Sequence, residues 1–150
     1  MHPIRPATPP EAHTIAALVD TAYDKWVAVI GRKPAPMLAD YRALIERGVV
    51  YVLEDDAKIV GVLVIWPLDD AMLIENVATH PDTQGRGIGQ QLLDFAEQKA
   101  REAGLTMMRL YTNEKFTANQ DYYRKRGYVH TRLEITPDGR RIVWMHKPLT

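Results

Sequence analysis

A glycine-rich turn over residues 84–89 carries the clearest chemical signal in this sequence. It reads QGRGIG and separates an apolar strand pattern from a long amphipathic helix pattern. Closely spaced glycines let a backbone turn sharply and approach a ligand. The first turn of the following helix adds unpaired amide groups and the positive end of the helix dipole. The pattern therefore predicts an anion site suited to phosphate or pyrophosphate, with Arg86 adding charge at its rim.

Other interpretations of this turn fit less well. The sequence contains no G-x-x-x-x-G-K-[ST] motif, so it lacks an ATPase phosphate loop. The glycine spacing is G-x-G-x-G, whereas the dinucleotide fingerprint needs G-x-G-x-x-G at the opening of a βαβ unit. A turn that only redirects the chain is the structural alternative. The strand before it and the helix after it favour the anion site.

The elements that must position this turn follow from hydrophobic periodicity and turn residues. The predicted order is β-α-α-β-β-β-α-β-α-β-β. The strands are expected at 3–7, 49–54, 58–66, 71–79, 106–112, 128–135 and 141–146. The helices are expected at 9–26, at 37–46, at 87–103, and from 117 to a point before Gly127.

The strand–helix–strand unit over residues 71–112 implies a parallel strand pair with a right-handed crossover. The remaining strands are joined as hairpins. The fold class is therefore α+β, with a mixed, mostly antiparallel, twisted sheet flanked by about four helices in a single domain over residues 1–150. Alternation along 71–79 is not clean, which indicates either burial on both faces or a bulge.

Two helix starts carry a capping-box pattern. Thr8 is followed by Pro9 and by Glu11 three residues on, and Thr117 is followed by Gln120. In such a box the two side chains satisfy backbone amides at the start of the helix. We therefore expect helices to begin after Thr8 and after Thr117.

Composition narrows the function classes. The chain has 150 residues, 46% of them hydrophobic, with 19 basic and 19 acidic side chains. This balance favours neither a nucleic-acid nor a membrane partner. There are no cysteines, and the five histidines lack metal-ligand spacing, so no metal is expected. The first residues lack the apolar core of a signal peptide, and we expect a cytoplasmic location.

Three segments together resemble the GNAT superfamily of acyl-CoA N-acyltransferases. Residues 84–89 are similar to its Q/R-x-x-G-x-G/A signature, and residues 77–81 to its V-x-V-x-P strand end. Residues 119–128 resemble its N-x-x-[FY]-Y-x-x-x-G-[FY] helix-to-strand motif. The resemblance covers roughly residues 45–135, and the predicted element order agrees with it from end to end.

The resemblance implies that the chain transfers an acetyl group from acetyl-CoA to a primary amine by direct attack in a ternary complex. It also implies a set of coenzyme A-binding residues, which act largely through the main chain. This set is Val77, Ala78, Thr79, Gln84, Gly85, Arg86, Gly87, Ile88, Gly89, Gln90, Asn119 and Tyr123.

The resemblance also implies two catalytic side chains. Tyr123 is placed near the thioester sulfur, where a phenol can protonate a departing thiolate, and Tyr122 is the fallback if the register differs by one. Glu75, a carboxylate in an apolar strand, is the candidate base. The alternatives are a core tyrosine, and a glutamate that faces solvent or pairs with Arg109.

The acceptor site implied by the resemblance lies at the first two helices, their loop and the last strand pair. Arg32 and Lys33 in that loop could attract a substrate carboxylate, and Tyr23 and Trp26 could pack on its apolar part. A solvated basic loop beside core aromatics is the alternative. The expected acceptor is a small-molecule or peptide amine, and the final strands leave a homodimer open.

A non-catalytic acyl-CoA-binding regulatory module of the same fold is the second function that the sequence allows. It would keep the turn over residues 85–89 without needing Glu75 or Tyr123. A nucleotide-binding domain is a third interpretation, which the missing phosphate-loop lysine weakens.

Overall fold

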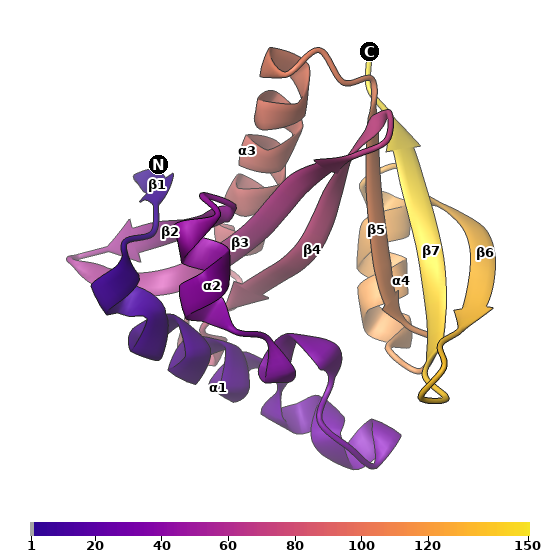
Figure 1. Cartoon of the computed structure of the whole chain (residues 1–150), viewed down its shortest axis with the longest axis horizontal. Helices are drawn as coiled ribbons and strands as arrows, with labels where there is room; N and C mark the ends of the chain where they lie inside the picture. The colour runs from indigo at the N-terminus through magenta and orange to yellow at the C-terminus, as the bar shows by residue number, and fades with distance from the viewer. Residues whose placement is uncertain (1) are drawn as a thin grey trace.

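Seven strands form one twisted sheet in the computed structural model, which describes residues 2–150 (Figure 1). The sheet order is β1-β2-β3-β4-β5-β7-β6. The strands are β1 Ile4–Pro6, β2 Val50–Asp55, β3 Lys58–Leu68, β4 Ala71–Thr79, β5 Met107–Asn113, β6 Val129–Ile135 and β7 Arg141–Pro148. Neighbouring strands pair antiparallel except β4 and β5, which are parallel. The predicted mixed sheet is confirmed.

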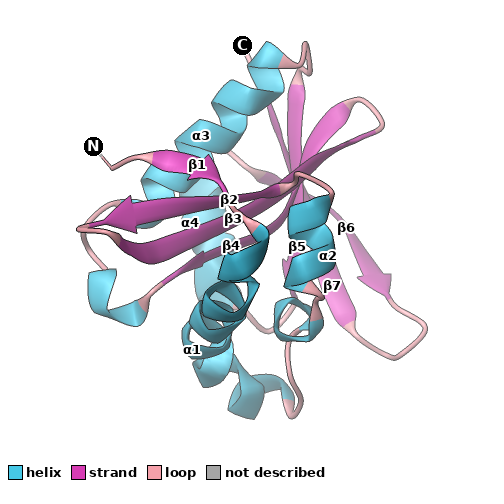
Figure 2. Cartoon of the chain, turned by 60° about the vertical axis from the view of Figure 1, so that its left-hand side comes forward, coloured by secondary structure: helices cyan, strands magenta, loops and turns pink. Residues whose placement is uncertain are grey.

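The helices lie on both faces of this sheet (Figure 2). The α-helices are α1 Ala12–Ile30, α2 Tyr41–Glu46, α3 Ile88–Glu102 and α4 Thr117–Lys125. Three short 3₁₀ turns are η1 Pro9–Glu11, η2 Ala35–Leu38 and η3 Pro81–Thr83. The helix α3 provides the crossover between β4 and β5. No helix among residues 2–150 combines the length and apolar character needed to cross a bilayer.

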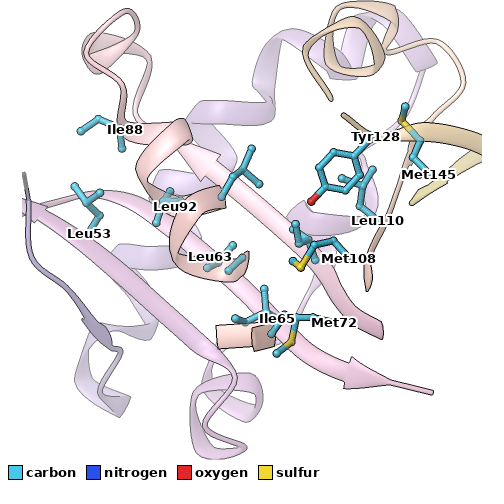
Figure 3. Packing of buried hydrophobic residues seen from close by; sticks show 14 of the residues in the cluster. Leu53, Leu63, Ile65, Met72, Ile88, Leu92, Met108, Leu110, Tyr128 and Met145 are labelled. Carbon is cyan, nitrogen blue, oxygen red and sulfur yellow. The ribbon is translucent and has the colours of Figure 1, made fainter. Parts of the chain in front are cut away.

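Two hydrophobic cores hold these layers together. The core beneath α3 joins Leu92 and Leu93 to Leu63 of β3 and to Tyr128, and Figure 3 shows part of this cluster. The second core joins the buried residues of α1 and α2 to β2 and β3, with Ile15 fully buried. The sheet is therefore covered on both faces over its central strands, which explains the nearly continuous apolar runs there.

The end of the first helix and the start of the second differ from the sequence prediction. The helix α1 continues to Ile30, four residues beyond the predicted end, and Gly31 closes it at φ 75°. The predicted helix over 37–46 is two elements: η2 comes first, and α2 begins after Asp40. The Asp40 carboxylate accepts a hydrogen bond of 3.1 Å from the Ala43 amide, which fixes this later start.

One capping box is confirmed and the other is wrong. The Glu11 carboxylate accepts a hydrogen bond of 2.8 Å from the Thr8 amide, as the first box requires. At α4 the cap residue is Phe116, and the Gln120 side chain is buried. Its amide donates to the carbonyl of Glu114 at 2.9 Å, so it satisfies the loop before the helix rather than the helix start.

Candidate active site

The site lies where the sheet divides between β4 and β5. The two strands pair through three residue pairs only, the last of which is Ile74 with Leu110. Beyond that pair, β4 stays with β3 and β5 stays with β7, and the two strands diverge (Figure 1). Main-chain groups of β4 that would continue the ladder therefore face an opening.

Glu75 is the extra residue of a bulge at the start of this opening. Val64 of β3 pairs with Asn76 and Ile65 pairs with Ile74, so Glu75 has no residue opposite it. The bulge changes the face to which alternate side chains point. Ile74 packs in the core beneath α3, whereas Ala78 packs in the core beneath α1. Both explanations offered for the irregular alternation, a bulge and burial on both faces, therefore apply.

The Glu75 carboxyl is half-buried and held on one side only. The Tyr111 hydroxyl, from β5, donates a hydrogen bond to its Oε1 atom. Its Oε2 atom has no hydrogen-bond partner among residues 2–150. Burial raises the pKa of Glu75 above its ordinary value, and the bond from Tyr111 and the charge of Arg47 oppose that rise. The net effect is a raised pKa, which makes the carboxylate a stronger base.

The glycine-rich turn presents a row of free amides to the same opening. Gly85 and Gly87 adopt φ 82° and 76°, a region that favours glycine, and Gly87 caps α3. Within the described chain, the amides of Gly85, Gly87, Ile88, Gly89 and Gln90 have no hydrogen-bond acceptor. Such a cluster at a helix N-terminus fits the oxygens of a pyrophosphate.

Arg86 is engaged elsewhere. Its Nη2 atom lies 2.6 Å from Oδ2 of Asp55, in an ion pair that joins the turn to the end of β2. Asp55 also lies 3.5 Å from the His2 ring. Arg86 does not line the cleft described next, whereas the other residues predicted to bind coenzyme A do.

A cleft of about 840 Å³ runs from this turn along β4 to α4. One wall comes from Thr21–Trp26 of α1. The predicted residues that line it are Tyr23, Trp26, Val77, Ala78, Thr79, Gln84, Gly85, Gly87, Ile88, Gly89, Gln90, Asn119 and Tyr123. The structure thus brings together residues from α1, β4, α3 and α4.

A smaller cavity of about 60 Å³ adjoins the cleft and contains Glu75. Four residues line both spaces: Tyr23, Val77, Asn119 and Tyr123. The free amides therefore lie in the larger cleft and Glu75 lies in the smaller cavity, and these four residues separate the two spaces. Any two molecules bound in the two spaces would meet beside Tyr123.

The Tyr123 hydroxyl has no hydrogen-bond partner in the described part of the chain. Its ring contacts Tyr122 and Tyr128 edge-on, with ring centroids 5.6 and 5.7 Å apart. Burial raises the pKa of Tyr123, the neighbouring Tyr122 adds to the rise, and Arg126 opposes it. The phenol therefore stays protonated and can donate. Tyr122 is more exposed and lines only the larger cleft.

A series of hydrogen bonds between buried groups, which the sequence did not predict, joins α1, β4, α2 and η2. The Tyr23 hydroxyl donates to Asn76 Oδ1 at 2.7 Å, and Asn76 Nδ2 donates to the Tyr41 hydroxyl at 3.0 Å. The Tyr41 hydroxyl in turn donates to the carbonyl of Pro36 at 2.6 Å. The buried amide of Asn76 thereby fixes both Tyr23 and the loop at Pro36. An amide in a strand of apolar residues was the available signal.

The predicted acceptor residues of the loop take different positions. Trp26 packs on Phe116, with ring centroids 4.3 Å apart. The side chains of Arg32 and Lys33 line neither space. Arg32 donates to the carbonyl of Asp138 at 3.0 Å, and the Lys33 carbonyl accepts from Arg140 at 2.9 Å.

Tyr111 and Arg140 also line the smaller cavity, but the sequence did not predict them as site residues. Both reach the cavity through contacts with residues that are distant in the sequence. Arg109, the alternative partner of Glu75, instead faces Asp69 and Asp70 in the β3–β4 turn. No group of three or more His, Asp or Glu side chains within residues 2–150 is arranged to hold a metal ion.

A family model described as an acetyltransferase (GNAT) domain matches residues 46–130. The chain belongs to the GNAT acetyltransferase family. The matched region of this GNAT domain spans the bulged strand, the glycine-rich turn and α4. The resemblance stated from the sequence is thus confirmed.

Two curated relatives match part of the GNAT domain. The amino-acid acetyltransferase of Ralstonia nicotianae is 34% identical over 67% of this chain, which covers 22% of that protein. The aminoalkylphosphonate N-acetyltransferase of Salmonella typhimurium is 35% identical over 42% of this chain, which covers 41% of that protein. The matched stretch therefore covers less than half the length of either relative.

Solved structures confirm the GNAT fold over the whole chain. The PaiA N-acetyltransferase of Thermoplasma acidophilum, solved in complex with coenzyme A, superposes with a TM-score of 0.80 at 18% identity. The two chains cover 99% of each other. A GCN5-related N-acetyltransferase from Rhodopseudomonas palustris gives a TM-score of 0.82 at 20% identity, covering 99% of this chain and 96% of its own.

Proposed function

We propose that this GNAT domain transfers the acetyl group of acetyl-CoA to the primary amine of a small-molecule or peptide acceptor while both substrates are bound. One observation carries the proposal. Val77 and Tyr123 line both the cleft beneath the free amides of α3 and the cavity that contains Glu75. A thioester anchored in the first space and an amine in the second would therefore meet at these two residues.

The cleft offers coenzyme A a backbone cradle. The amides of Gly85, Gly87 and residues 88–90 would hold its pyrophosphate, since they lack acceptors within residues 2–150. The unpaired edge of Val77–Thr79 would bind the pantetheine arm by strand-like hydrogen bonds, with Asn119 beside it. The PaiA structure, which contains coenzyme A and shares this fold, supports the assignment.

The chemistry needs one proton acceptor and one proton donor. The amine nitrogen attacks the thioester carbonyl, and Glu75 takes the proton that the nitrogen loses, directly or through water. Collapse of the tetrahedral intermediate breaks the C–S bond, and the Tyr123 hydroxyl protonates the departing thiolate. Proton exchange through solvent then returns a proton to Tyr123 and removes one from Glu75. The products are the acetamide and free coenzyme A. Holding both reactants in line supplies much of the rate enhancement.

The test measures thiol release from acetyl-CoA with a panel of amines, and calorimetry of coenzyme A binding in parallel. We expect acetyl-CoA-dependent acetylation of at least one amine, confirmed by mass spectrometry of the product. Coenzyme A binding without thiol release across the panel would instead support a regulatory acyl-CoA-binding module. Absence of both would overturn the proposal, and tighter binding of ATP than of coenzyme A would point to a nucleotide-binding domain.

A further inference from the structure

The cavity beside Glu75 has a simple charge pattern. Its lining residues include one acidic residue, Glu75 on β4, and one basic residue, Arg140 in the turn before β7. The remaining lining side chains are aromatic, aliphatic or neutral polar. The two charged residues of this lining come from different parts of the fold.

Two of the three guanidinium nitrogens of Arg140 are hydrogen-bonded within the described residues. Its side chain is only 13% exposed. Nε lies 3.1 Å from Oδ2 of Asp138, and Nη2 donates to the carbonyl of Lys33 at 2.9 Å. Nη1 has no hydrogen-bond partner among the described residues. These two hydrogen bonds fix the orientation of the planar guanidinium group, and the Nη1 atom remains able to donate to a ligand.

Asp138 does not cancel the positive charge of this corner. Its carboxylate lies 3.1 Å from Arg140 and 3.9 Å from Arg32, so two guanidinium groups share one carboxylate. Two positive charges and one negative charge leave a net charge of +1. Two further hydrogen bonds, from Arg32 to the Asp138 carbonyl and from Arg140 to the Lys33 carbonyl, tie the loop before η2 to the β6–β7 turn.

We infer that the acceptor is a small amine that also carries an anionic group, a carboxylate or a phosphonate, and that Arg140 binds this anion. This inference rests on the proposed function, because the amine must face Glu75 and Tyr123 at the other end of the cavity. Arg140 would thus bind the anionic group that the sequence prediction assigned to Arg32 and Lys33. Those two residues instead form hydrogen bonds with the β6–β7 turn. The small volume of the cavity, about 60 Å³, restricts the acceptor to a short molecule.

The experiment compares amines that differ in the anionic group. The pairs are glycine with glycinamide, β-alanine with β-alaninamide, and 2-aminoethylphosphonate with ethanolamine. We expect kcat/KM to favour the anionic member of at least one pair by roughly 10- to 100-fold, the range expected of charged hydrogen bonds. The carboxylate and phosphonate arms identify which anion is preferred.

Variants connect that preference to Arg140. Arg140→Gln should remove the preference, mainly by raising KM for the anionic amines, and Arg140→Lys should restore part of it. Arg141→Gln is the matched control, because Arg141 pairs with Glu114 at the surface and lines neither space. Thermal unfolding of each variant checks that the fold is intact.

The outcomes separate this inference from the proposed function. Equal or better use of the neutral amines, or a preference that survives in Arg140→Gln, overturns the inference while acetyl transfer stands. If no amine reacts, the anion site is tested by calorimetry, in which N-acetyl-β-alanine is titrated into protein loaded with coenzyme A. Binding that is lost in Arg140→Gln supports the anion site, and no binding in the unsubstituted protein overturns it.

Discussion

Tyr111 donates a hydrogen bond to Glu75 across the fork where β4 and β5 separate. The two side chains come from strands that no longer pair at this level, so the bond bridges the mouth of the opening. It occupies one carboxylate oxygen and leaves the other without a protein partner in the described chain. The proposed base is therefore oriented by one strand while it is carried by the other.

Replacing Tyr111 by Phe should move the activity profile to higher pH. The Tyr111 hydrogen bond lowers the pKa of Glu75 against the opposing effect of burial, so its loss lets that pKa rise further. The base then becomes available only at a higher pH, and kcat/KM near pH 6 should fall more than kcat/KM near pH 9. A profile of Tyr111→Phe that is lowered equally at every pH would contradict this assignment.

Replacing Glu75 by Gln should change the shape of the pH profile. The raised pKa of Glu75 means that activity is lost as pH falls through that value, because the carboxylate takes up a proton. The amine must also be unprotonated. We expect log kcat/KM to rise with a slope of about two at low pH in the unsubstituted protein and about one in Glu75→Gln. Identical slopes in both proteins would show that Glu75 is not the base.

Replacing Tyr123 by Phe should reduce kcat by about 10²- to 10³-fold, the usual contribution of a positioned acid. Coenzyme A affinity, measured by calorimetry, should stay unchanged because the ring packing is kept. Tyr122→Phe is the control, since Tyr122 is more exposed and does not line the Glu75 cavity. A larger effect in the control would transfer the acid role to Tyr122.

Replacing Gly87 by Ala tests the backbone cradle. Gly87 has φ 76° and Gly104, at the other end of α3, has φ 75°, and no atom would lie within 4 Å of an added Cβ at either glycine. Both Ala variants should therefore lose about 1–2 kcal/mol of stability. Only Gly87→Ala should also weaken coenzyme A binding, by about tenfold, because its strain disturbs the amides at the helix start. Equal affinities in the two variants would remove the turn from the coenzyme A site.

Glu97 should matter for stability rather than for catalysis. Its buried carboxylate lies 2.9 Å from Lys147 Nζ and 3.4 Å from Arg126 Nη2, which joins α3 to β7 and to the end of α4. Glu97→Ala leaves these two cations without that partner, and we expect a loss of about 2–4 kcal/mol in urea unfolding. Glu102→Ala removes an exposed pair with Lys99 and should cost less than about 0.5 kcal/mol.

The sequence predicted local features of the fold well where one short signal decides them. The glycines over residues 85–89, the first capping box and the crossover helix all follow from neighbouring residues. The second capping box failed because burial of the Gln120 side chain directs its amide to loop carbonyls. The predicted end of α1 at Trp26 is wrong because the buried stripe fades there, whereas the helix continues to the stop signal at Gly31.

The candidate site was predictable only in part. Glu75 and Tyr123 were named through a family resemblance, and their roles stay predictions. Tyr111 and Arg140 join the site through contacts across the sheet and across the chain, which no local pattern encodes. The charge of Arg32 and Lys33 predicts contact with an acidic group of the substrate, whereas in the structure their loop contacts the hairpin turn that carries Arg140, a residue that lines the cavity.

The bulge at Glu75 has a consequence for how this strand can change in length. Val77 packs with the core beneath α3 and Ala78 with the core beneath α1, as do their β3 partners Leu63 and Val62. Pairing Glu75 in the ladder would shift the register by one and exchange the faces of every later side chain in the strand. Deleting Glu75 would instead give a regular ladder with the same pairs and faces, so it should spare both cores and remove only the proposed base. The bulge therefore lets the strand carry one additional residue without emptying either core.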